Sequence, residues 1–115
     1  MKEHYNCPVQ ATINVISGKW KVQILWRLTF GPLRFAALRD GLQKITEKVL
    51  TDQLRQLEAD GLIVRAATNS VPPAVTYSLS EEGEKLVPLM TGLCKWGTSH
   101  FGIVGNLPPL PRELA

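Results

Sequence analysis

Residues 46–66 read TEKVLTDQLRQLEADGLIVRA and combine a helix start, an apolar stripe, a stop signal and the beginning of a strand. Thr46 is a favourable N-cap residue, because its hydroxyl accepts a hydrogen bond from a free N–H of the first turn. Three leucines then recur at the spacing of one helix face, namely Leu50, Leu54 and Leu57. Gly61 supplies the C-terminal stop. The stretch predicts a helix over residues 47–60 and a β-rich segment from residue 62.

Three shorter helical segments precede this helix. Pro8 suits the first position of a helix that ends at Ser17-Gly18, because the N–H that proline lacks has no partner there. Residues 19–28 carry a helical apolar stripe, which a Gly-Pro pair terminates. Residues 34–40 predict a short amphipathic helix, and Gly41 allows a tight reversal after it. A short helix, a tight turn and a longer helix are typical of a helix-turn-helix.

The segment after Gly61 is rich in β-forming residues. Residues 62–66 and 75–79 predict two strands of a hairpin, whose loop at residues 68–73 is stiffened by two prolines. Ser80 is a favourable cap for a last helix, in which Pro88 predicts a kink. The order of the elements predicts an α+β fold, mainly α, of the winged helix-turn-helix type.

The composition is that of an ordinary globular domain. The chain has 115 residues, of which 44% are hydrophobic and 20% charged, so it can bury one core and is not disordered in composition. We expect one winged domain over residues 1–105 and a Pro-rich tail, extended or poorly ordered, over residues 106–115. No apolar run approaches the roughly 18 residues of a membrane span, and because the N-terminal residues form no apolar region we expect no signal peptide. Two cysteines are too few for a disulfide scaffold, so we expect a cytoplasmic protein without a membrane partner.

The formal net charge of +3 is unevenly distributed. Between Gly18 and Arg55 there are eight basic and three acidic residues, a net of +5. The rest of the chain has five basic and seven acidic residues, a net of −2. A concentrated basic stretch is the electrostatic pattern of a polyanion site, although a solvated face produces the same pattern.

The outer face of helix 47–60 predicts contacts with double-stranded DNA. Arg and Lys can bind guanine or phosphate, Thr can contact a base edge or a thymine methyl, and Asp can accept a hydrogen bond from cytosine. Helix N-termini around the turn, and the tip of the wing, add positions that approach the phosphates. The expected DNA contacts are Lys19, Lys21, Arg34, Thr46, Lys48, Thr51, Asp52, Arg55, Asn69, Ser70 and Pro72. The alternative is that these are ordinary solvated residues and that the wing is only a rigid hairpin.

A series of short motifs runs from Asn6 to Gly97. The motifs are Cys7-Pro8-Val9, Ile16-Ser17-Gly18-Lys19-Trp20-Lys21, Gly31-Pro32-Leu33-Arg34-Phe35, Ile45-Thr46-Glu47-Lys48-Val49-Leu50-Thr51, Leu54-Arg55-Gln56-Leu57-Glu58-Ala59-Asp60-Gly61-Leu62, Val71-Pro72-Pro73, Tyr77-Ser78-Leu79 and Trp96-Gly97. In this order and at these spacings, the chain resembles the HxlR-type bacterial transcription regulators, winged-helix relatives of the MarR group. The resemblance implies a DNA-binding homodimer with N- and C-terminal dimerisation helices, a short, roughly palindromic operator and control of nearby genes.

Cys7 is a candidate redox sensor. Some regulators that this chain resembles use a Cys-Pro at this position to sense oxidants or electrophiles. A thiol just before a helix N-terminus lies where the helix dipole favours negative charge. The alternative is a small apolar residue packed at an interface. Cys94, within the last helix, is expected to pack.

Neither a metal site nor an active site is expected. The chain holds two His and two Cys, but the spacing of His4, Cys7, Cys94 and His100 fits no zinc pattern. No His–carboxylate arrangement accompanies either cysteine, so we expect no enzyme and no cofactor. The sequence leaves two alternatives to the DNA-binding regulator. One is a winged-helix protein-interaction module without DNA affinity, and the other is a regulator that responds to a small-molecule effector at the dimer interface.

Overall fold

A computed structural model of the chain describes residues 7–103. Helices and a small sheet follow one another in the order α1 (Pro8–Ile16), α2 (Lys21–Leu28), β1 (Leu33–Arg34), α3 (Phe35–Gly41), α4 (Glu47–Ala59), β2 (Ile63–Ala67), β3 (Val75–Leu79), α5 (Glu81–Glu84) and α6 (Val87–Phe101). This is the predicted winged helix-turn-helix, mainly α with a small antiparallel sheet. The expected tail over residues 106–115 and His4 lie outside the described residues.

The predicted helix caps are confirmed. Thr46 is the N-cap of α4, and its hydroxyl accepts a hydrogen bond from the Val49 N–H at 3.1 Å. Ser80 is the N-cap of α5, and its hydroxyl accepts from the Gly83 N–H at 3.0 Å. Gly61 follows α4 with a φ of +78°, a left-handed conformation that side-chain-bearing residues rarely adopt. These local signals therefore fix both ends of the predicted long helix.

The sheet has three strands rather than the predicted two. The spatial order is β1-β3-β2, with Leu33 opposite Tyr77 and Arg34 opposite Thr76. Arg34, expected inside the short helix, is instead a strand residue and the N-cap of α3. A strand of two residues has no periodicity to read, because only its pairing with a distant segment defines it.

The last helix differs from its prediction. Instead of one kinked helix after Ser80, the chain forms the short α5 and then, after a turn, the longer α6. Pro88 lies in the first turn of α6, where its missing N–H costs nothing. Proline here starts a helix rather than kinking one.

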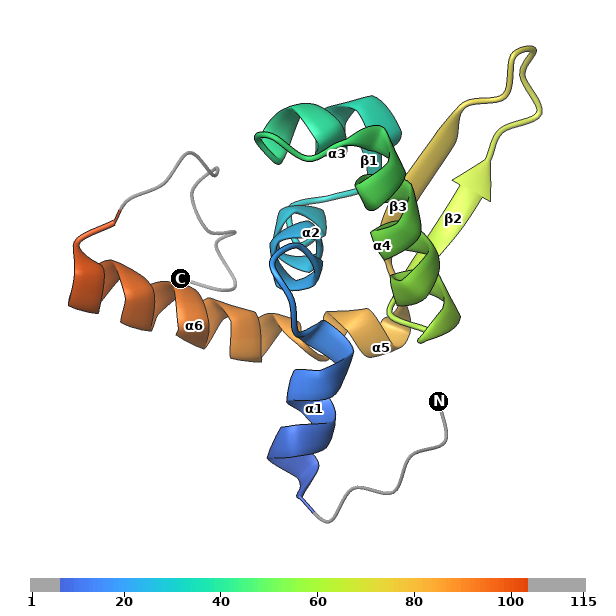
Figure 1. Cartoon of the computed structure of the whole chain (residues 1–115). Helices are drawn as coiled ribbons and strands as arrows, with labels where there is room; N and C mark the ends of the chain where they lie inside the picture. Colours follow the sequence, from blue (N-terminus) through green and yellow to red (C-terminus); the bar gives the residue numbers. More distant parts are fainter. Residues whose placement is uncertain (1–6, 104–115) are drawn as a thin grey trace.

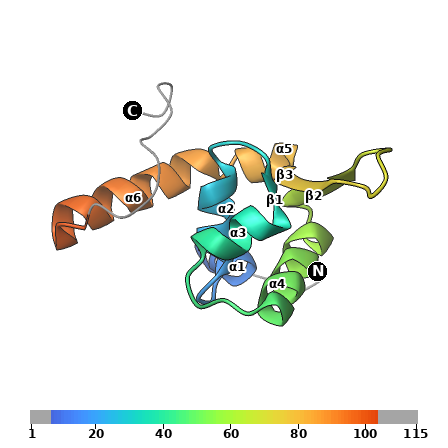
Figure 2. The ribbon, with the colours of Figure 1, turned by 90° about the horizontal axis from the view of Figure 1, so that it is seen from above.

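The core lies beneath α4. Leu50, Leu54 and Leu57 of α4 are all buried, as the stripe predicted, and they join a cluster that includes Ile24 and Leu25 of α2. Figures 1 and 2 show that α6 and the β2–β3 hairpin extend in opposite directions from this helical centre. The fold thus separates two projecting features, a hairpin beside α4 and a long C-terminal helix.

Candidate nucleic-acid interface

The helix-turn-helix consists of α3, the turn at residues 42–46 and α4. The turn residue with a left-handed backbone is Lys44, with a φ of +71°, and not the predicted Gly41, which is the last residue of α3. A Cβ at Gly41 would lie 2.7 Å from the Arg27 guanidinium, so this glycine leaves room for a side chain of α2. An ion pair of 2.7 Å between Arg39 and Glu47 joins α3 to the first turn of α4.

The outward face of α4 carries the four residues expected from the periodicity. Lys48 and Arg55 are exposed, whereas Thr51 and Asp52 are half-buried. The Lys48 ammonium lies 2.9 Å from an Asp52 carboxylate oxygen, one turn further along the helix. The ion pair neutralises Lys48 locally, while no carboxylate of residues 7–103 lies within ion-pair distance of Arg55.

The other expected cations lie on different elements. Lys19 precedes α2, and its ammonium is 4.8 Å from the centre of the Trp20 ring. Lys21 is the first residue of α2 and is half-buried. Arg34 is exposed at the junction of β1 and α3. The predicted cations therefore belong to three separate segments, namely the start of α2, the junction of β1 and α3, and α4.

The tip of the hairpin is organised by its own hydrogen bonds. The Thr68 hydroxyl accepts from the Ala74 N–H at 2.9 Å, and the Ser70 hydroxyl donates to the Pro72 carbonyl at 2.9 Å. Asn69 and Pro72 are exposed, and Figure 1 shows the tip extending beyond α4. These bonds connect residues across the tip, and they already engage the Ser70 hydroxyl.

A groove of about 350 Å³ separates α4 from the hairpin. Its lining residues are Thr51, Leu54, Arg55 and Glu58 of α4, Arg65 of β2 and Tyr77 of β3. Arg65 and Tyr77 are direct cross-strand partners, so their side chains lie on the same face of the sheet. Neither residue is among the DNA contacts expected from the sequence. The signal that could have found them is the alternation along residues 63–67, which places Arg65 on the face of the buried Ile63.

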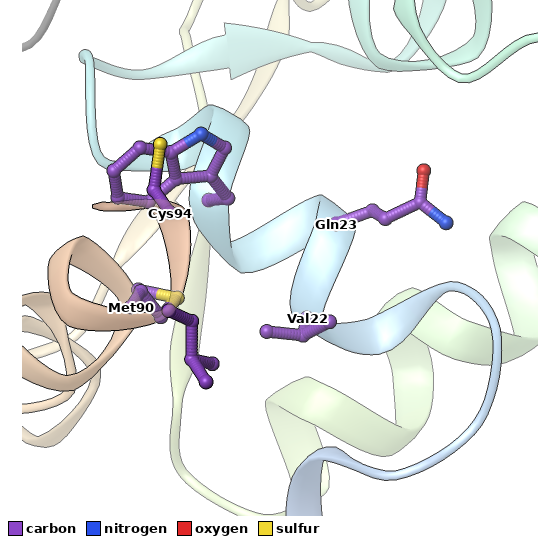
Figure 3. A pocket seen from close by; sticks show the side chains of 6 residues that line it. Val22, Gln23, Met90 and Cys94 are labelled. Carbon is purple, nitrogen blue, oxygen red and sulfur yellow. The ribbon is translucent and has the colours of Figure 1, made fainter. Parts of the chain in front are cut away.

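The two cysteines occupy different surroundings. Cys7 is the exposed N-cap residue of α1 and makes no side-chain capping bond. Cys94 is half-buried and packs against the core, as expected, beside an apolar pocket of about 250 Å³ between α2 and α6. Figure 3 shows this pocket, to which Val22 and Met90 contribute from the two helices. Within residues 7–103, no group of three His, Cys, Asp or Glu side chains could hold a metal ion.

The first and last helices expose apolar side chains. On α1, Val9 is 68% exposed and Ile13 is 48% exposed. On α6, Leu93, Trp96 and Phe101 are between 52% and 64% exposed, whereas Met90 is buried. The Trp96 ring stacks on His100 with 4.5 Å between the ring centres. These surfaces leave large apolar groups in water unless another chain covers them.

Comparisons with known proteins agree with this architecture. A family model described as HxlR-like helix-turn-helix matches residues 15–103. An uncharacterized HTH-type transcriptional regulator of Bacillus subtilis (strain 168), YtcD, is 50% identical over 103 residues, which cover 90% of this chain and 82% of that protein.

Two solved structures are also similar. The redox regulator HypR in its reduced form superimposes with a TM-score of 0.80 at 42% identity, covering 83% of this chain and 94% of that one. The reduced form of the transcriptional regulator YodB from B. subtilis gives a TM-score of 0.72 at 25% identity, with coverages of 84% and 95%. In addition, the helices formed by residues 7–103 include none with the length and apolar character needed to cross a membrane.

Proposed function

Because the chain belongs to the HxlR-like helix-turn-helix family, we propose that it is a cytoplasmic transcriptional regulator that binds a short palindromic operator in double-stranded DNA as a homodimer. The observation that carries this proposal is the outward face of α4 beside a projecting hairpin. An α-helix fits the major groove, where each base pair presents a distinct pattern of donors and acceptors. A hairpin tip at its side can reach the neighbouring minor groove or backbone.

Arg55 is the strongest candidate for reading a base. Its guanidinium is exposed on α4 and has no ion-pair partner within residues 7–103. Arginine can donate two hydrogen bonds to one guanine, a contact that distinguishes guanine from the other bases. Thr51 lies one turn before Arg55 and offers a hydroxyl and a methyl group to the same groove.

The apolar residues of α1 and α6 support the homodimer. Trp96 and Phe101 are more than 60% exposed, although aromatic side chains are among the groups that gain most from burial. A second copy of the chain would cover them and would place two α4 helices on one duplex. Two symmetric recognition helices read two half-sites about one helical turn, or a multiple of it, apart.

Cys7 supports a response to thiol oxidation or electrophiles. Its thiol is exposed at the start of α1, the helix that presents Val9 and Ile13. HypR, to which this chain is 42% identical, is a redox regulator. Modification of Cys7 would alter α1 at the dimer surface and thereby the spacing of the two recognition helices. A proposed chain of effects thus connects an exposed thiol to DNA affinity.

A gel-shift experiment tests the proposal. The full chain is mixed with the DNA upstream of its own gene and, separately, with random DNA over a range of salt concentrations. We expect a salt-sensitive shift at micromolar protein or below. Arg55→Ala should cost about 1–3 kcal/mol of binding free energy at the specific site only. An equal loss on random DNA would mean that Arg55 contacts a phosphate and not a base. Without any salt-sensitive shift, the protein-interaction module would be the better explanation.

A further inference from the structure

We propose that the groove between α4 and the β2–β3 hairpin holds one sugar–phosphate strand of the bound duplex, with Arg65 and Tyr77 as phosphate contacts. This inference rests on the proposed DNA binding and names a contact surface that lies outside the recognition helix. It also separates the contacts that position the duplex from those that read its sequence.

The position of the groove follows from the two features that border it. A helix in the major groove and a hairpin tip in the adjacent minor groove lie on opposite sides of one sugar–phosphate strand. That strand must therefore pass through the space between α4 and the hairpin. The space is a groove of about 350 Å³ that is lined by residues of both α4 and the hairpin.

The hairpin contributes one cation and one hydroxyl to the groove. On the face that carries them, the cross-strand pairs run from the buried Ile63–Leu79, through Arg65–Tyr77, to Ala67–Val75. The polar pair thus lies between a buried apolar pair at the α4 end of the hairpin and an apolar pair nearer the tip. Arg65 is exposed and Tyr77 is half-buried, and both residues line the groove.

The hairpin residues of the groove suit a phosphate. Arg65 carries a guanidinium, which binds phosphate oxygens through two parallel hydrogen bonds, and Tyr77 carries a hydroxyl donor. Within residues 7–103 the Arg65 guanidinium does not lie within ion-pair distance of a carboxylate, in contrast to Lys48, which is paired with Asp52. The Arg65 guanidinium therefore remains available to an anion.

Glu58 is the one acidic residue among those that line the groove. It lies three residues after Arg55, further from the N-terminus of α4. Its carboxylate repels a phosphate, so it confines the strand to the part of the groove near Thr51 and Arg55. Removing this charge should therefore strengthen binding to any duplex, the opposite of the effect of removing Arg65.

The test uses fluorescence anisotropy to measure the affinity of the full chain for the upstream DNA and for a random duplex of equal length. Each affinity is measured across a salt series. Four variants are compared with the wild type: Arg65→Ala, Tyr77→Phe, Glu58→Gln and, as a control with the same charge change on the exposed face of α6, Lys95→Ala. Circular dichroism first establishes that each variant is folded.

We expect Arg65→Ala to reduce the slope of log affinity against log salt by about 1.8, since each of two half-sites loses one phosphate contact at about 0.9. If the variant and the wild type bind equally at 1 M salt, this change in slope corresponds to a loss of affinity on the order of 60-fold at 0.1 M salt, on both duplexes. Tyr77→Phe should weaken both complexes by about 30-fold with an unchanged slope, because it removes one hydrogen bond from each of the two half-sites but no charge. Glu58→Gln should tighten both, and Lys95→Ala should change neither.

The possible failures are distinguishable. If the wild type shows no salt-sensitive binding, the proposed function and this inference both fail. If the wild type binds and Arg65→Ala keeps its slope, or loses affinity for the upstream DNA alone, the phosphate assignment is wrong while DNA binding stands. If Arg65→Ala does not fold, Arg65→Lys is used instead, because it keeps the positive charge but lacks the two parallel donors of the guanidinium. This variant should weaken both complexes while the salt slope stays the same. An unweakened Arg65→Lys complex would overturn the bidentate contact.

Discussion

Gly83→Ala should destabilise the protein, because the added Cβ would collide with the backbone of another segment. Gly83 is buried in α5, which packs against the base of the hairpin. A Cβ at this position would overlap the carbonyl oxygen of Leu62 and lie 3.3 Å from the Leu79 side chain. The obstacle is backbone, so it cannot rotate away as a flexible side chain would.

The size of the effect follows from what must move. The Leu62 carbonyl accepts the Ser80 N–H at 3.0 Å, and the Ser80 hydroxyl donates to the Gly61 carbonyl at 2.6 Å while capping Gly83. Overpacking costs about 1–3 kcal/mol, and a weakened hydrogen bond adds about 1 kcal/mol. A total of about 3 kcal/mol corresponds to a decrease in Tm of about 12 °C, given an unfolding entropy of about 2.1 cal/mol/K per residue.

Thermal unfolding followed by circular dichroism, at one protein concentration because a dimer has a concentration-dependent Tm, measures this decrease. Gly92→Ala is the matched control, because a Cβ there meets no atom within 4 Å and alanine favours the helix by about 0.5–1 kcal/mol. We expect its Tm to rise by about 2–4 °C. The proposed collision would be refuted by a Gly83→Ala protein that melts within about 3 °C of the wild type, or by Tm shifts of both variants in the same direction.

Three further predictions concern the cap of α4, the dimer and the thiol. Thr46→Ala removes the acceptor of the 3.1 Å bond from the Val49 N–H, so urea denaturation should show about 1 kcal/mol less stability; an unchanged midpoint would contradict the capping role. Trp96→Glu places a charge in the exposed apolar stripe of α6 and should yield a monomer in analytical ultracentrifugation. If the variant remains a dimer, the dimer interface does not include this stripe. Cys7→Ser should bind DNA as the wild type does but lose its release by diamide, whereas a variant still released by oxidant would reject the sensor.

Much of the local structure could be predicted from adjacent residues. Thr46 and Ser80 carry a hydroxyl that meets a free N–H within three residues, so their capping needs no tertiary contact. The leucine stripe of α4 likewise depends only on the helical repeat, and its burial is confirmed. For the candidate site, the same periodicity identified the outward residues of α4 but not the pairing of Lys48 with Asp52, which depends on side-chain rotamers.

The sequence by itself thus determined the order of the helices, their caps and the outward face of α4, because each depends on residues within about one helical turn of one another. It also predicted the hairpin of the wing, because two β-rich segments flank a short loop. Only the tertiary structure decided the strand at Leu33, the separation of α5 from α6 and the close approach of Gly83 to Leu62. It also brought Arg65 and Tyr77 to the same groove as Arg55. The strand, the close approach and the groove join segments many residues apart, and their pairing is settled by the packing of the whole core rather than by any local signal.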